Sequence, residues 1–213
     1  LGLLRGIMSS PDAGALMLEN RVNGMEVAKD SEDTSTENPH FERADFSDDE
    51  LPTPLQEKAD WTTEDRVAFD SFALRLRALT DQGADRKLES CIVQIKKWHK
   101  AGYSPIVFCR YIETAKYVAK KLALNLEKNA LIECVTSNDP DDVRKDRIAK
   151  MAPEQSGKKL RVLVATDCLS EGINRQGLFD AVIHYDLPWN PNRLEQREGR
   201  VDRFGQLQPE VQT

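Results

Sequence analysis

The strongest constraint on the fold is a regular alternation of short apolar runs and amphipathic segments after Ser104. Apolar runs bounded by polar residues are typical of buried strands. They occupy residues 105–110, 131–136, 160–165 and 179–185. An amphipathic pattern predicts a helix at 113–126, and further helices are predicted at 139–151, where Asp139-Pro140 suits a first turn, and at 193–201. Strands separated by helices of this length predict an α/β fold with a parallel sheet covered by helices on both faces.

The first half of the chain has a different composition. Residues 1–25 predict two short helices, the second starting near Pro11. Residues 26–60 contain twelve acidic and three basic residues and few aliphatic ones, which is typical of a linker or poorly structured insertion. Thr62 opens a predicted helix, and another spans 85–101 with Gly102 as its stop. We therefore divide the chain into residues 1–25, 26–60, a helical lead-in over 61–103, and an α/β domain over 104–213.

Composition excludes several classes of protein. No apolar run approaches the roughly 18 residues that a membrane span needs, so we expect no membrane partner. The four cysteines have no C-x-x-C spacing, which favours reduced thiols in a cytoplasmic protein over a metal site. The chain lacks a signal peptide and begins without methionine, and we expect it to be a piece of a larger protein. Residues 61–213 carry three more basic than acidic residues, which leaves a nucleic-acid surface open.

Two polar segments follow the last two predicted strands, at the edge where ligands bind in open α/β sheets. Residues 166–176 form a polar loop that is equally consistent with an ordinary strand-to-helix connection. The second segment carries arginines every three or four residues, at positions 193, 197, 200 and 203. They are either a solvated face paired with Glu195, Glu198 and Asp202, or a set suited to forked contacts with phosphate. Gly199 favours the second interpretation, because glycine inside a helix costs about 1 kcal/mol and indicates a close approach.

These residues resemble a known family. Gln196-x-x-Gly199-Arg200-x-x-Arg203 resembles motif VI of superfamily 2 helicases, and residues 165–174 resemble motif V. Residues 106–110 resemble motif IV, and residues 135–137 with Arg144 and Arg147 resemble the segment after it. The motifs keep the family's order over residues 85–206. The segments 170–176, 187–191 and 199–206 are similar to the Swi2/Snf2-like branch, in particular to bacterial RNA-polymerase-associated Snf2-type ATPases and Snf2-like helicases of phage defence.

The resemblance implies the second of two RecA-like lobes, with ATP bound between them. Arg200 and Arg203 would be arginine fingers, and Gln196 would position the γ-phosphate or the attacking water. Gly172 and Asn174 would face the nucleotide or couple its state to the nucleic-acid groove, although many relatives carry aspartate at the position of Asn174. The residues expected along a nucleic-acid backbone are Arg110, Thr136, Ser137, Thr166 and Asn190.

The sequence lacks the other half of such a site. It contains no G-x-x-x-x-G-K-[ST] loop and no Asp-Glu pair after an apolar strand, so we expect ATP and Mg²⁺ to be held mainly by the missing first lobe. We expect no metal ligands here and no ATP hydrolysis by the chain alone. The implied function is the second motor lobe of an ATP-dependent Snf2-like translocase or helicase, whose partners are the first lobe and, above other nucleic acids, duplex DNA.

Two alternatives remain. A non-catalytic nucleic-acid-binding or interaction module would keep the fold, but it has no reason to retain Gln196, Arg200 and Arg203 together. An unrelated Rossmann-type enzyme is disfavoured, because no G-x-G-x-x-G opens a helix.

Overall fold

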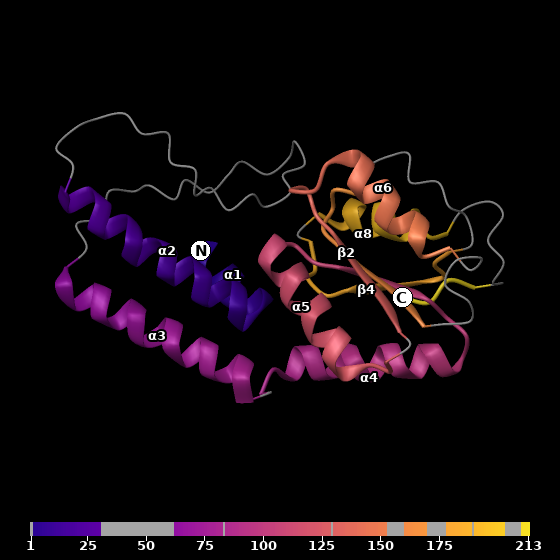
Figure 1. Ribbon diagram of the computed structural model, residues 1–213, viewed down its shortest axis with the longest axis horizontal. Helices are drawn as coiled ribbons and strands as arrows, with labels where there is room; N and C mark the ends of the chain where they lie inside the picture. The colour runs from indigo at the N-terminus through magenta and orange to yellow at the C-terminus, as the bar shows by residue number, and fades with distance from the viewer. Residues whose placement is uncertain are drawn as a thin grey trace. The chain divides into compact units, whose positions relative to one another are not determined.

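The computed structural model describes residues 2–30, 62–82, 84–128, 130–152, 160–169, 178–188, 190–202 and 210–213. The chain divides into two compact units, Leu1–Asp85 and Arg86–Thr213. The first unit is helical and the second is built on a parallel sheet (Figure 1). None of the helices in these ranges is long and apolar enough to cross a lipid bilayer.

The helical unit consists of α1 (Gly2–Ser9), α2 (Pro11–Asp30) and α3 (Thr63–Gln82). Helix α2 starts at Pro11, as the sequence predicts, and small residues let the helices approach closely. A Cβ atom on Gly14 would come within 2.8 Å of the Ile7 Cα, so glycine is required where α2 meets α1. Arg77 on α3 joins that helix to α2, because it donates to Asp12 at 2.6 Å and to Glu19 at 2.9 and 3.1 Å.

The start of α3 confirms the predicted helix signal at Thr62. The Thr62 hydroxyl accepts the Asp65 backbone N–H at 3.1 Å, and the Asp65 carboxylate accepts the Thr62 N–H at 2.8 Å. This reciprocal capping box satisfies two backbone donors that a helix start leaves open. Bonds from Thr62 hold the pKa of Asp65 below its usual value, first through the backbone N–H and then through the hydroxyl.

The second unit alternates helices and strands. Its elements are α4 (Arg86–Lys100), β1 (Pro105–Phe108), α5 (Ile112–Asn125), β2 (Leu131–Val135), α6 (Asp141–Lys150), β3 (Arg161–Ala165), β4 (Ala181–His184) and α8 (Pro191–Glu198). Gly102, in the turn between α4 and β1, has a φ of 91°, a conformation that favours glycine at the predicted helix stop.

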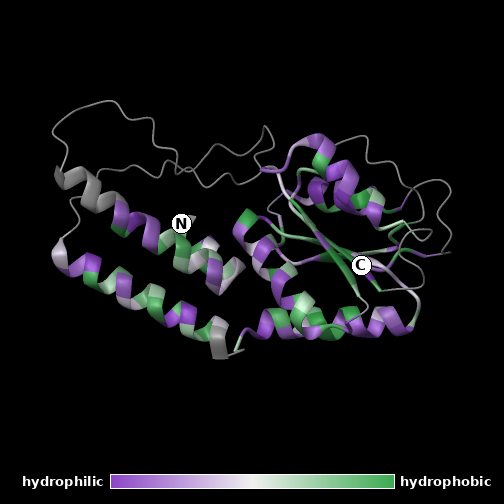
Figure 2. Ribbon diagram, viewed as in Figure 1, coloured by the Kyte–Doolittle hydropathy of each residue, from purple (hydrophilic) through white to green (hydrophobic). Residues whose placement is uncertain are grey.

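Within the described part of the chain, four strands form one parallel sheet in the order β2-β3-β1-β4. Ile106 of β1 pairs with Leu163 of β3 on one side and with Val182 of β4 on the other. At the outer edge of β4, Ala181 forms a parallel bridge with Gln212. The strands are predominantly hydrophobic, whereas the helices mix hydrophobic and hydrophilic residues (Figure 2).

Alternate residues of each strand enter two separate cores. On one face, Val107 and Val164 pack with residues of α4 and α5, including Ile95 and Val118. On the other face, Phe108 and its neighbours pack with Ile148 of α6 and with Phe179 and Val201. Figure 1 shows α4 and α5 on one side of the sheet and α6 and α8 on the other. The predicted α/β fold with both faces covered is therefore confirmed.

The structure differs from the sequence prediction at two helix boundaries. Helix α2 continues to Asp30 and so includes the first residues of the segment expected to be irregular from position 26. The remainder of that segment lies outside the described residues. Helix α8 starts at Pro191 and ends at Glu198, earlier than the predicted 193–201, because Asn190 caps its start and Pro191 has a backbone suited to the first turn.

Candidate functional site

The carboxyl ends of the strands bring four polar segments to one edge of the sheet. Arg110 follows β1, Thr136 and Ser137 follow β2, Thr166 and Asp167 follow β3, and Asp186 follows β4. Helix α8 begins after the last of these segments and folds back over the Phe108 side of the sheet. Most of the predicted site residues that the structure describes therefore belong to this edge or to α8.

Asn190 sets the start of α8. Its side-chain oxygen accepts the Asn192 backbone N–H at 3.0 Å, which makes it the helix N-cap. We predicted a nucleic-acid contact for Asn190, and the structure assigns its oxygen a capping role. A cap of this kind is worth about 1 kcal/mol.

Arg197 is the anchor between α8 and the sheet. Its side chain is only 2% exposed. Its Nε and Nη2 donate to the two carboxylate oxygens of Asp167 at 2.7 and 2.9 Å, and its Nη1 donates to the Asp186 carbonyl at 2.8 Å. The guanidinium also lies 5.2 Å from the centre of the Phe108 ring. Such forked contacts fix both the distance and the orientation of the two groups.

Asp186 connects three other parts of the same edge. One carboxylate oxygen accepts Lys87 Nζ of α4 at 2.7 Å, and the other accepts the Arg110 backbone N–H at 2.8 Å. The Lys87 ammonium lies 4.2 Å from the centre of the Tyr185 ring, where the ring face favours a cation. The loop after β1, the loop after β4 and the first turn of α4 are thus held together.

Two further contacts hold the ends of α8. Arg193 Nη1 lies 3.5 Å from Asp167, so this carboxylate faces two arginines. Near the other end, His184 Nε2 lies 3.3 Å from the Glu198 carboxylate. Burial lowers the pKa of His184, with the hydrogen bond to Glu198 acting in the opposite direction. Because an ionised carboxylate only accepts hydrogen bonds, a neutral His184 ring that bonds Glu198 through Nε2 carries its proton on that nitrogen.

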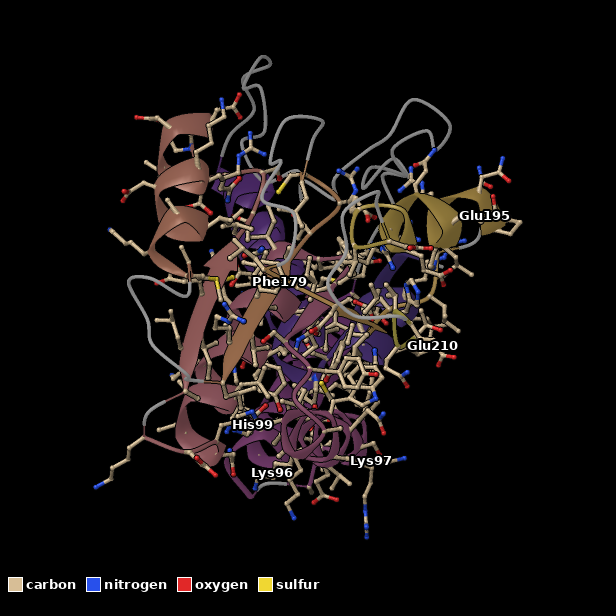
Figure 3. The ribbon with its side chains drawn as sticks, turned by 90° about the vertical axis from the view of Figure 1, so that its right-hand side faces the viewer. Lys96, Lys97, His99, Phe179, Glu195 and Glu210 are labelled. Carbon is tan, nitrogen blue, oxygen red and sulfur yellow. The ribbon has the colours of Figure 1, made fainter. Side chains whose placement is uncertain are left out.

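Gln196 and Arg200 lie elsewhere on this segment. Gln196 is exposed on α8, and Arg200 is partly buried in the turn that follows the helix. The Arg200 backbone N–H donates to the Arg197 carbonyl at 3.2 Å, which ties the turn directly to the anchored residue. Glu195 lies on the outer side of α8 (Figure 3).

The structure changes the basis of both sequence interpretations of the arginine helix. Gly199 caps α8 with a φ of −63° instead of lying within it, and among the described residues a Cβ atom there would meet the carbonyl oxygens of Glu195 and Gln196. The cost of a glycine inside a helix therefore no longer supports a close approach at this position. Arg193 and Arg197 bind Asp167 in the loop after β3, instead of the expected acidic residues of their own helix.

The loop after β2 is organised by internal contacts. The Thr136 hydroxyl and backbone N–H both donate to Asp139, at 3.0 and 2.9 Å. Arg147 donates to the Cys134 carbonyl at 2.5 Å and lies 3.1 Å from Asp139. The Ser137 hydroxyl is buried without a hydrogen-bond partner among the described residues. These contacts fix the loop, and they leave the predicted nucleic-acid contacts of Thr136 and Ser137 as predictions.

The loop after β3 is bonded in a similar way. The Thr166 hydroxyl donates to the Cys168 sulfur at 3.2 Å, and Arg144 donates to the Cys168 carbonyl at 2.7 Å. Arg144 also pairs with Asp141 of its own helix. Both arginines that resemble the family's post-strand segment, Arg144 and Arg147, thus bind main-chain carbonyls near the sheet edge.

Three predicted site residues, Gly172, Asn174 and Arg203, lie outside the described residues. Within the described ranges, no group of three or more His, Cys, Asp or Glu side chains is placed to hold a metal ion. Gln196 on α8 carries an amide and Arg200 in the turn after it carries a guanidinium, and both groups suit phosphate oxygens. Asp167 and Asp186, the nearby carboxylates described above, are each paired with cations.

Sequence reasoning missed the residues that hold this site together. The predicted site residues did not include Lys87, Asp167, Asp186 or His184. They included Arg197 only as one of four arginines that form either a solvated face or a set suited to phosphate. Arg193 and Arg197 stand four positions apart, which was visible in the sequence and predicted a shared face. Their counter-ion comes from another element, and no local spacing identifies it.

The comparisons with known proteins agree with the fold. The family profile described as "Helicase conserved C-terminal domain" matches residues 85–205. An uncharacterized ATP-dependent helicase, YqhH of Bacillus subtilis (strain 168), is 58% identical over 48 residues, 22% of this chain and 8% of that protein. The RNA polymerase-associated protein RapA of Serratia proteamaculans (strain 568) is 35% identical over 103 residues, 48% of this chain and 10% of that protein. The chain thus spans about a tenth of the length of the curated relatives that it matches.

A solved structure shows a similar fold. The C-terminal part of the Fun30 ATPase domain superposes with a TM-score of 0.52, covering 75% of this chain and 55% of that chain. The sequences are 13% identical over this match, so the likeness concerns the fold.

Proposed function

Because the chain belongs to the helicase conserved C-terminal domain family, as a Snf2-like lobe with a RecA-like sheet, we propose that it is the second motor lobe of an ATP-dependent translocase acting on duplex DNA. The observation that carries this proposal is the placement of α8. A buried arginine fixes this helix at the carboxyl edge of the sheet, and the helix and its turn carry Gln196 and Arg200.

Arg200 and Arg203 are the proposed arginine fingers. In phosphoryl transfer, negative charge spreads over the transferred group, and a guanidinium that meets this charge accelerates the reaction by about 10³ to 10⁵. Gln196 would orient the γ-phosphate or the attacking water with its amide. Pairing of Asp167 with Arg193 and Arg197 supports the proposal, because an unpaired carboxylate at this edge would repel phosphate.

The first lobe is the proposed partner for nucleotide binding. The sequence has no loop for the β-phosphate and no carboxylate pair for Mg²⁺, so a bound nucleotide needs both from elsewhere. Gly172 and Asn174 would face the nucleotide from this lobe. We propose that the chain alone does not hydrolyse ATP.

The proposed nucleic-acid track follows the same edge. Arg110, Ser137 and Asn190 follow three different strands, so together they span the width of the sheet. Hydroxyl, amide and guanidinium donors suit phosphate contacts that position a strand without reading its sequence. Thr136 and Thr166 belong to the same proposal, although a phosphate contact by either hydroxyl requires it to turn away from Asp139 or Cys168.

The cytoplasm is the proposed location of the protein. All four cysteines are free thiols, and Cys91, Cys109 and Cys168 are buried. Free thiols are kept in reducing compartments, where disulfides are rare.

The test is the ATPase activity of the full protein that contains this chain, measured with duplex DNA, single-stranded DNA and RNA. We expect duplex DNA to stimulate turnover, and Arg200→Ala or Arg203→Ala to lower kcat by about 10³-fold or more while DNA affinity stays unchanged. Glu195→Ala is the matched control, because this exposed side chain lies on the outer side of the same helix. The isolated chain should show no turnover.

Three results would contradict the proposal in whole or in part. Turnover indifferent to both arginines would make the segment after Arg193 structural and the chain a binding module on a motor fold. Turnover by the isolated chain that depends on Arg200 would show that the first lobe is not required. Stimulation by RNA alone would reassign the polymer and leave the arginine roles in place.

A further inference from the structure

We propose that Arg197 and Asp167 form a positioning pair that sets the orientation of α8 and thereby aims Gln196 and Arg200. The inference rests on the proposed function, because it concerns how the same site is held in its working geometry. It assigns no contact with ATP to either residue.

The first support is how α8 is attached. The helix has eight residues, and Arg197 is its one buried residue. An isolated helix of this length is unstable in water, and most helices in proteins are held by an apolar face. Helix α8 has no buried apolar residue, so a buried charged group fixes its place on the sheet.

The second support is the geometry of the contacts. Arg197 donates through three nitrogens to two segments, the carboxylate of Asp167 after β3 and the carbonyl of Asp186 after β4. Its guanidinium also lies over the Phe108 ring, beneath the helix. Three directed bonds from a planar group fix the rotation of the helix about its axis, which a single point charge does not.

The third support is the short path from the pair to the proposed finger. The Arg200 backbone N–H bonds to the Arg197 carbonyl at 3.2 Å, and Gln196 is the neighbour of Arg197 in the chain. Asp167 lies in the loop after β3, five positions before Gly172. The pair therefore joins α8 to the start of the loop after β3.

A purely stabilising ion pair makes a different prediction. Its removal lowers the stability of the fold and leaves the turnover of the folded fraction unchanged. A positioning pair lowers kcat of the folded protein, since a displacement of about 1 Å at a catalytic group costs about 10²-fold in rate. The KM for ATP should change little, because the first lobe supplies the main nucleotide contacts.

The experiment measures DNA-stimulated kcat and KM for ATP in the full protein, well below its melting temperature. The variants are Arg197→Met, Arg197→Lys, Asp167→Asn, Arg200→Ala and the double variant Arg197→Met/Arg200→Ala. Arg77→Gln is the control, because Arg77 also forks onto carboxylates but lies in the helical unit. We expect Arg197→Met to lower kcat about 10²-fold, Arg197→Lys to be intermediate, and Arg77→Gln to retain full kcat.

The double variant separates positioning from independent effects. Residues that act as a unit are strongly non-additive, so Arg197→Met should cost little more in a background that already lacks Arg200. A double variant whose loss of kcat equals the product of the two single-variant losses would overturn the inference. Unchanged kcat in Arg197→Met, with a large loss in Arg200→Ala, would overturn it and leave the proposed function standing. Unchanged kcat in Arg200→Ala would instead contradict the proposed function.

Circular dichroism and DNA affinity check that each variant is folded. If Arg197→Met does not fold, Arg197→Lys and Asp167→Asn carry the comparison, because both keep a polar partner in place. Full kcat in both of these variants would overturn the inference.

Discussion

The buried ion pair beneath α8 makes an asymmetric prediction for stability. Arg197 is 2% exposed and Asp167 is 21% exposed. Asp167→Ala leaves a buried guanidinium whose remaining contacts among the described residues are the Asp186 carbonyl and the Phe108 ring. Removing one partner of a buried pair costs about 3–5 kcal/mol, because the other charge stays buried without compensation.

The reverse substitution should cost less. Arg197→Met removes the buried charge and keeps much of the side-chain volume, while Asp167 still faces Arg193 at 3.5 Å and reaches solvent. Lost hydrogen bonds should cost about 1–2 kcal/mol. The double variant Asp167→Ala/Arg197→Met should resemble Arg197→Met and be about 2 kcal/mol more stable than Asp167→Ala alone, because it leaves no buried charge.

Urea unfolding followed by tryptophan fluorescence measures these differences. Of the three tryptophans in this sequence, a Trp61→Phe background leaves Trp98 and Trp189, whose positions both fall within the range Arg86–Thr213. With a urea dependence of about 2 kcal/mol per molar, Asp167→Ala should lower the midpoint by about 2 M and Arg197→Met by less than 1 M. The reasoning is refuted if Arg197→Met is the costlier change, or if the double variant loses the sum of both.

Two further predictions concern the core and the thiols. Ile95→Ala should lower the free energy of unfolding by about 2–5 kcal/mol, because Ile95 is fully buried on α4. Val93→Ala, on the exposed side of the same helix, should change it by no more than about 0.5 kcal/mol. Equal urea midpoints for the two variants would contradict the described packing of α4. Burial raises the pKa of Cys134 to about 12, so above pH 9 the unfolded chain loses this thiol proton while the native chain keeps it. The contribution of Cys134 to the free energy of unfolding should then fall by about 1.4 kcal/mol per pH unit. Cys134→Ala should remove this contribution to the pH dependence, which urea midpoints at pH 7, 9 and 10 measure. Wild type and variant with the same pH dependence would contradict the prediction.

The sheet was predictable because its signal is local. Each strand is a short apolar run whose alternate residues enter opposite cores, as Val107 and Phe108 do. Helix starts and stops were equally local, as the capping box at Thr62 and the positive φ of Gly102 illustrate. These features depend on neighbours in the sequence, so spacing and residue type were enough.

The contacts of α8 were not predictable in the same way. Arg197 meets Asp167 and the Asp186 carbonyl only because the carboxyl ends of β3 and β4 lie at the same edge of the sheet, on either side of β1. The misplaced Gly199 has a different cause, because the cap that sets the start of α8 is a local signal that the sequence prediction did not use. Capping by Asn190 and Pro191 starts the helix early enough that the glycine falls after its last residue. Pairing across elements depends on tertiary geometry that the linear pattern does not contain.

The strand order has a consequence for how the sheet is assembled. Strands β1 and β2 are made first, yet they are not neighbours, and each pairs with β3. When synthesis has reached residue 159, β1 and β2 are both present, but they do not pair with each other. Arrival of β3 supplies the shared partner of both strands, so the ladder closes in one late and non-local step, a topology associated with slow folding. Pairing of β4 with β1 then completes the edge from which α8 departs.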